Sequence, residues 1–344
     1  MLLSAGGRLT AIVPAYNEAD TVADTVHSLL DQTLAPAEVI VVDDCSTDDT
    51  GQIARDAGAR VVRPPANTGS KAGAQTFALQ KVDTEFVMAV DADTVLAPDA
   101  IEKLAPAFDD REVVAACGFV LPRRVRTLWE RARYVEYMLA FSFFKRIQDH
   151  FGKPLISSGC FSIYRLDQLR AVGGWSTRTM AEDMDLTWTY YAAGHKVRFV
   201  PEAVAYPIEP HNFTFMGKQL RRWSHGFVQN VRLHWRSVLE LGYLRSIVSI
   251  AFWDALLASV AYLLLLPLLA VFVDPVILVA YLVDAPVVLV PVLWQAIGRG
   301  EAGRALISFP SFFVLRIVNS VFMLSAVWRE FVLRRPLLVY EKGH

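Results

Sequence analysis

The segment FVMAVDAD, Phe86–Asp93, places two carboxylates directly after five apolar residues. A buried strand of a parallel sheet is almost entirely apolar, so the two acids are expected just past its carboxyl end. Carboxylates this close repel each other unless a cation compensates them, and a divalent metal shared with a phosphate does so through oxygen ligands. Taken alone, such a pair is more often a solvated turn, so the prediction of a metal site depends on the rest of the chain.

Three more apolar segments precede this one, and polar residues follow each of them. They are Leu9–Pro14, Glu38–Val42 and Arg60–Arg63. Helical patterns separate them, so the order predicts right-handed βαβ units in a mainly parallel, Rossmann-like α/β sheet. Ligands bind outside the carboxyl ends of such strands. Side chains expected to converge there are Tyr16, Asp44, Lys71, Asp91 and Asp93.

The middle of the chain carries two further candidate sites. Glu182 and Asp183 open a predicted helix, where the helix dipole favours acids and a purely structural role is equally open. Ile156–Arg165 precedes them and has the pattern of a strand that backs a pocket. Further on, Gln219 and Trp223 share a helix face with Arg222, which could clamp a phosphate. The alternative there is an interfacial Arg–Trp pair in front of a membrane span.

The C-terminal part of the chain has the composition of a membrane protein. Ile247–Val273 and Val276–Ile297 are each longer than the roughly 20 apolar residues that cross a bilayer. The loop over residues 298–304 is basic, so the positive-inside rule predicts that this loop and the N-terminal part face the cytosol. Ala305–Val327 is predicted as either a third span or a helix in the membrane interface.

Net charge and cysteine content narrow the possible partners and the compartment. The formal net charge of −1 indicates no nucleic-acid partner. The 3 cysteines are far apart and odd in number, which fits a reducing compartment.

Five motifs in series resemble the family 2 glycosyltransferases with a GT-A fold. The closest resemblance is to the membrane-bound group that includes cellulose, chitin and hyaluronan synthases. Val13–Glu18 and Val42–Asp48 are similar to the first two strand ends of that family, and Asp91-Ala92-Asp93 stands at its metal-binding Asp-x-Asp. Ala181-Glu182-Asp183 resembles its Thr-Glu-Asp motif with alanine for threonine, and Gln219–Trp223 is a complete Gln-x-x-Arg-Trp motif.

The resemblance implies a role for each matching residue. Those assigned to the nucleotide sugar are Pro14, Ala15, Tyr16, Glu18, Asp44, Lys71, Asp91, Ala92, Asp93 and Arg222. Lys71 would reach the diphosphate and Arg222 would steady it as it leaves. Asp93 would ligate Mg²⁺ or Mn²⁺ directly, with Asp91 nearer the nucleotide. Asp183, with Glu182 beside it, would be the catalytic base. The acceptor-binding residues would be Gly159, Cys160, Gln219 and Trp223.

Together these features predict three regions. They are a cytosolic GT-A domain over residues 1–210, interfacial helices over 211–246, and a membrane region with two or three transmembrane or interfacial helices over 247–344. The expected activity is inverting transfer of glucose or N-acetylglucosamine from a UDP-sugar to an acceptor hydroxyl at the cytosolic membrane face.

The acceptor is left open between a growing polysaccharide and a single lipid, polyprenyl phosphate or protein. The synthases carry spans before the catalytic domain and several after it, whereas here none is expected before it and two or three after. A polysaccharide pore would then need several subunits. A non-catalytic nucleotide-sugar-binding scaffold is the remaining alternative.

Overall fold

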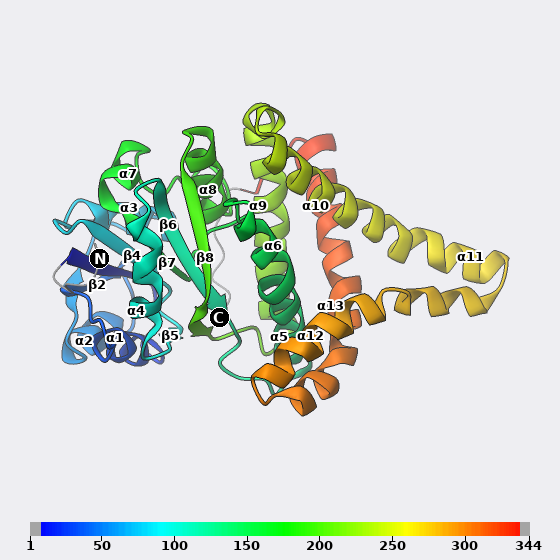
Figure 1. The fold of residues 1–344 in the computed structure, drawn as a ribbon, viewed down its shortest axis with the longest axis horizontal. Coiled ribbons are helices and arrows are strands. Elements are labelled where there is room, and N and C mark those ends of the chain that lie inside the picture. The colour runs from blue at the N-terminus through cyan, green and yellow to red at the C-terminus, as the bar shows by residue number, and fades with distance from the viewer. Residues whose placement is uncertain (1–7, 338–344) are drawn as a thin grey trace. The chain divides into compact units, whose positions relative to one another are not determined.

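The apolar segments predicted as strands belong to one mixed sheet. Within residues 8–337, which the computed structural model describes, this sheet has eight strands in the order β3-β2-β1-β4-β7-β6-β8-β5 (Figure 1). The strands are β1 (Leu9–Ala15), β2 (Glu38–Asp43), β3 (Arg60–Val62), β4 (Phe86–Val90), β5 (Thr94–Leu96), β6 (Val113–Val120), β7 (Phe161–Arg165) and β8 (Lys196–Pro207). Strands β3, β2, β1 and β4 pair in parallel. Strand β7 is antiparallel to both β4 and β6, whereas β6 and β8 are parallel.

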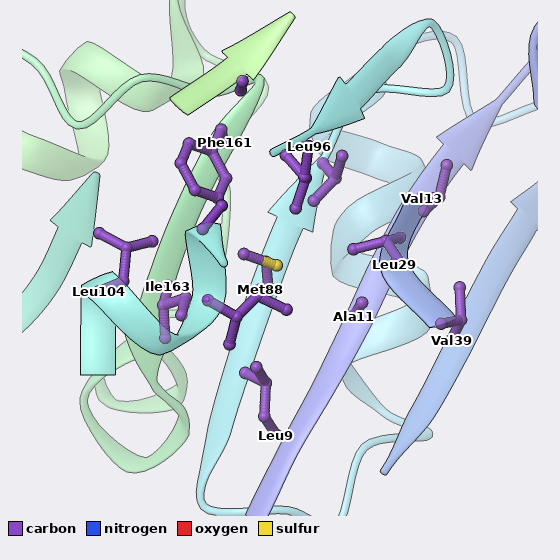
Figure 2. Packing of buried hydrophobic residues seen from close by; sticks show 14 of the residues in the cluster. Leu9, Ala11, Val13, Leu29, Val39, Met88, Leu96, Leu104, Phe161 and Ile163 are labelled. Carbon is purple, nitrogen blue, oxygen red and sulfur yellow. The ribbon is translucent and has the colours of Figure 1, made fainter. Parts of the chain in front are cut away.

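Helices cover the sheet. They are α1 (Val22–Leu30), α2 (Thr50–Asp56), α3 (Lys71–Leu79), α4 (Ala100–Leu104) with the 3₁₀ turn η2 (Ala105–Asp109), α7 (Leu166–Ala171) and α8 (Glu182–Ala192). Alternate residues of β1, such as Ala11 and Val13, join one buried cluster with Leu29 of α1 and Leu104 of α4 (Figure 2). The intervening Ile12 is also buried, so β1 is covered on both faces, as expected for a central parallel strand.

Residue contacts divide the chain into two units, which are described separately. One holds the residues up to Arg123 together with Arg146–Ile208, and therefore contains the sheet. The other holds Arg124–Lys145 together with the residues from Glu209 onward.

The second unit is helical. Its elements are α5 (Leu128–Leu139), the π-helical η3 (Ala140–Phe144), α9 (Phe213–Glu240), α10 (Gly242–Val260), η4 (Ala261–Leu265), α11 (Leu266–Phe272), η5 (Pro275–Leu282), α12 (Ala285–Gly298), α13 (Ala302–Val327) and η6 (Trp328–Val332). Helix α6 (Lys145–His150) follows η3 directly, and only its first residue, Lys145, belongs to this unit. Helix α13 contacts α5, α9, α10 and α12.

Among the described residues, 3 helical segments are long and apolar enough to cross a membrane: Leu244–Phe272, Pro275–Gly298 and Ala302–Val332. By length and composition, the third segment therefore qualifies as a span like the other two. Asp284, which lies in the second of these segments, forms an ion pair with Arg316 of α13. The Arg316 guanidinium also lies 4.6 Å from the ring centroid of Tyr262, so this pair links all three segments.

Candidate functional site

The Asp-x-Asp segment lies at the carboxyl end of β4, in a tight turn before β5. The Thr94 amide donates to the carbonyl of Asp91 at 3.1 Å and closes the turn. Ala92 is buried, and its carbonyl accepts the Thr25 hydroxyl of α1 at 2.9 Å. The backbone between the two acids is therefore anchored, and Asp91 and Asp93 are both half-buried at the predicted edge of the sheet.

Lys71 lies among the acids of this site. Its Nζ forms an ion pair with Asp91 and lies 3.7 Å from Oε1 of Glu182, and it donates to the carbonyl of Gly159 at 3.0 Å. Burial alone would lower the pKa of Lys71, but the charges of Asp91, Glu182 and Asp183 raise it well above its usual range. The structure thus brings four predicted site residues, Asp91, Gly159, Glu182 and Asp183, from three separate segments of the chain around the Lys71 ammonium group.

Asp183 occupies the first turn of α8 and is held at both carboxylate oxygens. Oδ2 accepts the Gly159 amide at 2.8 Å, and Oδ1 accepts the Met184 amide at 2.9 Å. Asp185, two residues on, is buried and bound by two nitrogens of Arg178 at 2.7 Å each. The acids in the first turn of α8 therefore have different roles. Asp185 binds Arg178 and anchors the helix, whereas Asp183 lies beside Gly159 in the site.

Gly159 lies between the carboxylate and the lysine. A Cβ at this position would lie 2.8 Å from Oδ2 of Asp183 and 3.1 Å from Nζ of Lys71. Strand pairing brings it there, since Val90 pairs with Phe161 and the Asp91 amide approaches the carbonyl of Cys160 at 3.4 Å. The predicted strand Ile156–Arg165 was wrong in its first half. Strand β7 begins only at Phe161, because the chain turns just before it with the Phe161 amide bound to the carbonyl of Ser158 at 3.1 Å.

The ends of β1 and β2 form a second group of predicted residues. The Asp44 amide donates to the carbonyl of Ala15 at 2.8 Å, which ties the two strand ends together. The Asp44 carboxylate is buried and accepts both the amide and the hydroxyl of Thr68 at 2.8 Å each. Thr68 was not predicted as a site residue, although the polar loop before Lys71 contains it; threonine in a polar loop has no distinctive sequence signal.

Two residues next to these strand ends have left-handed backbones. Asn17 has φ of 54° and Cys45 has φ of 64°, which side-chain-bearing residues rarely adopt. The Asn17 amide is held by the Ser46 hydroxyl at 3.0 Å, and its side-chain oxygen accepts the Thr47 amide at 2.8 Å. Such strain persists where surrounding bonds enforce it, often at ligand sites.

Three further predicted residues lie near the end of β1. Pro14 is half-buried within β1, Tyr16 is exposed just after it, and the Glu18 amide donates to the Thr50 hydroxyl at 2.7 Å. Gln219, Arg222 and Trp223 lie in α9 of the second unit.

Comparison with known proteins identifies the domain. Residues 10–173 match the family model for glycosyl transferase family 2. Poly-beta-1,6-N-acetyl-D-glucosamine synthase of Staphylococcus epidermidis is 28% identical over 223 residues, which is 63% of this chain and 54% of that protein. The synthase of the same name from Staphylococcus aureus strain MSSA476 is 24% identical over the same shares. The chain thus spans about half the length of these curated relatives.

Solved structures share the fold. A mannosyltransferase of Pyrobaculum calidifontis, PcManGT, determined with GDP-Man and Mn²⁺, gives a TM-score of 0.62 at 18% identity and covers 95% of this chain and 88% of its own. S. aureus TarS 1–349 gives a TM-score of 0.52 at 18% identity, with 90% of each chain covered. The family match and the shared fold identify residues 10–173 as a glycosyltransferase family 2 domain of the GT-A type.

Proposed function

We propose that this protein transfers a sugar from a nucleoside diphosphate sugar to an acceptor hydroxyl, with inversion at the anomeric carbon. The observation that carries the proposal is the cluster formed by Asp91, Glu182 and Asp183 around Lys71 and the Gly159 backbone. These residues come from segments far apart in the chain and meet at the sheet edge where ligands of open α/β folds bind.

Asp183 is the proposed general base. A hydroxyl that attacks an anomeric carbon must lose its proton, and a positioned carboxylate contributes typically 10²–10⁴-fold to such a step. The two amides that bind Asp183, at 2.8 and 2.9 Å, hold its carboxylate in one orientation. One base and one direct displacement imply inversion.

Asp91 and Asp93 are proposed to hold a divalent metal together with the donor. Carboxylate oxygens are the ligands that Mg²⁺ and Mn²⁺ prefer. Within residues 8–337, no group of three or more His, Cys, Asp or Glu side chains is placed to hold a metal without help. The carboxylates of this turn fit a divalent metal: Asp93 would hold it directly, with Asp91 nearer the nucleotide, and diphosphate oxygens would complete its ligands. When bound, the metal neutralises negative charge on the leaving diphosphate.

Lys71 and Arg222 are the proposed cationic partners of the diphosphate. Lys71 begins α3, and the positive end of a helix favours phosphate. Pro14, Ala15, Tyr16, Glu18 and Asp44 are assigned to the nucleotide from the family resemblance. Asp44 accepts a hydrogen bond from Thr68 and donates its amide to the carbonyl of Ala15, which supports a rigid binding surface for the nucleotide.

The donor we propose is a UDP-sugar, with N-acetylglucosamine favoured over glucose because the similar synthases are named for that sugar. The same similarity favours extension of a polysaccharide. Gly159, Cys160, Gln219 and Trp223 are assigned to the acceptor side from the resemblance. The three apolar segments support membrane integration, and the basic loop at residues 298–304 supports a catalytic unit that faces the cytosol.

The test is a panel of radiolabelled UDP- and GDP-sugars given to the purified full chain in detergent with Mg²⁺ or Mn²⁺, followed by product sizing. We expect turnover of UDP-N-acetylglucosamine, its loss on chelation with EDTA, and its recovery when metal is restored. A polymer, a one-sugar lipid and a glycosylated protein differ in mobility, so the product identifies the acceptor. Absence of both transfer and donor hydrolysis with every sugar would leave a nucleotide-sugar-binding scaffold.

A further inference from the structure

We propose that Arg133 of α5 is a positioning residue for the Gln-x-x-Arg-Trp motif, holding Gln219 and Trp223 in one orientation. This inference rests on the proposed function, because it assigns a supporting residue to the acceptor side of the same reaction. All the contacts that carry it lie within the second unit.

Arg133 contacts two members of the motif at once. Its Nε and Nη2 donate to Oε1 of Gln219 at 3.1 and 2.6 Å. Its Cζ lies 4.3 Å from the ring centroid of Trp223, within the range of a cation–π contact. Gln219 and Trp223 are four residues apart on α9 and therefore lie on the same helix face, so one guanidinium group can contact both side chains.

Carboxylates fix the guanidinium from its other sides. Arg133 is fully buried and forms an ion pair with Glu136 one turn along α5. Its Nε lies 3.8 Å from Oε2 of Glu209, and Oε1 of Glu209 accepts the Tyr137 hydroxyl at 2.8 Å. Gln219 closes the ring, because its Nε2 donates to the same Oε2 at 3.3 Å. The arginine therefore has little freedom to move away from the motif.

The charges of this network favour a permanently cationic Arg133. Burial alone would lower the pKa of Arg133, but Glu136 and Glu209 raise it. Burial raises the pKa of Glu209, and the guanidinium opposes that shift. A buried ion pair of this kind adds little net stability compared with apolar residues of similar size. We therefore interpret the pair as fixing the orientation of Arg133 rather than as stabilising the fold.

The Trp223 indole contacts the Arg133 guanidinium and still has solvent-exposed surface that a ligand could contact. It is 37% exposed, whereas Arg133 has no exposed surface. An indole that stacks on a sugar ring must hold its plane, and a displacement of about 1 Å can cost on the order of 10²-fold in rate. In our proposal, the contact with Arg133 fixes the orientation of the Trp223 indole ring.

The discriminating variant is Arg133→Lys. Lysine keeps the buried positive charge but lacks the planar fork that binds Gln219 and covers the indole. We measure transfer of radiolabelled N-acetylglucosamine from its UDP donor to a β-1,6-linked N-acetylglucosamine oligosaccharide, and in parallel its release as free sugar to water. Arg133→Lys should raise the acceptor KM and lower the ratio of transfer to hydrolysis by about 10-fold or more, with the donor KM kept.

A second variant covers the case in which charge imbalance unfolds the protein. Arg133→Met combined with Glu209→Gln removes opposite charges together and should show the same fall in the ratio. The matched control is Arg131→Lys, two positions away on the same helix and therefore on a different face, which should leave the ratio unchanged. Hydroxyl-radical footprinting with mass spectrometry provides a readout that needs no activity, and Trp223 should become more reactive in both Arg133 variants.

The outcomes separate the two proposals. A wild-type ratio and unchanged Trp223 reactivity in Arg133→Lys would overturn the positioning role. Equal losses of transfer and hydrolysis, with unchanged Trp223 reactivity, would also overturn it, because they would indicate a general structural role for Arg133. An inactive wild-type chain in which the Arg133 variants still expose Trp223 would overturn the proposed function but support the positioning contact.

Discussion

The backbone amide of Gly159 donates to Oδ2 of Asp183 at 2.8 Å, across 24 residues of sequence. The same glycine offers its carbonyl to Lys71 at 3.0 Å. One peptide segment thus binds the proposed base through its amide and the main cation of the site through its carbonyl. Two backbone amides, those of Gly159 and Met184, therefore orient the Asp183 carboxylate.

Replacement of the proposed base tests its chemistry. Asp183→Asn keeps an oxygen that can accept the Gly159 amide but cannot remove a proton. We expect transfer to fall by about 10²–10⁴-fold while the donor still binds. Steady-state transfer together with calorimetric titration of UDP measures both quantities. Substantial turnover by a variant that binds UDP normally would reject Asp183 as the base.

Gly159→Ala tests the close approach. The added Cβ would lie 2.8 Å from Oδ2 of Asp183, so the carboxylate, the lysine or the loop must shift. We expect transfer to fall on the order of 10²-fold, with a melting temperature near that of the wild type. Gly303→Ala is the matched control, because a Cβ there meets nothing within 4 Å and transfer should be unchanged. An active Gly159→Ala enzyme would show that the contact is dispensable.

The raised pKa of Lys71 predicts how the stability of the protein depends on pH. Its folded pKa is raised above the ordinary 10.5, so its stabilising contribution is fully present below the unfolded pKa and is lost as the pH rises through the folded pKa. The difference in unfolding free energy between wild type and Lys71→Met should therefore stay constant from pH 7 to about pH 10 and shrink above it. Denaturant titrations across this range provide the measurement. A difference that changes already near neutral pH would contradict a fully charged Lys71.

The ion pair between Asp284 and Arg316 predicts how the apolar segments respond to single and double changes. Removal of one partner leaves an uncompensated charge among apolar helices, which costs about 3–5 kcal/mol for buried pairs and less where water reaches the pair. Arg316→Met should therefore unfold more readily in detergent than the wild type. The double variant Arg316→Met with Asp284→Leu should regain much of the loss. Equal destabilisation by the single and double variants would show that the pair is not coupled.

The amino-acid sequence by itself determined the parallel strands β1 to β4 and the residue types at their ends. The apolar run before Asp91 can only be buried, and the acids after it can only lie at the strand end, because apolar burial and charge solvation act locally. The same local pattern predicted α8 from Glu182 and the apolar segments from their length. Family motifs then supplied the roles that we propose for these residues.

Only the tertiary structure decided which groups touch. Asp91 is a predicted site residue and Asp185 lies two positions after another, yet Asp91 pairs with Lys71 while Asp185 is bound by Arg178. The buried contact of Arg133 with Gln219 joins residues 86 positions apart. Such pairings depend on strand order and helix packing, which bring together side chains whose separation along the chain carries no signal of their contact.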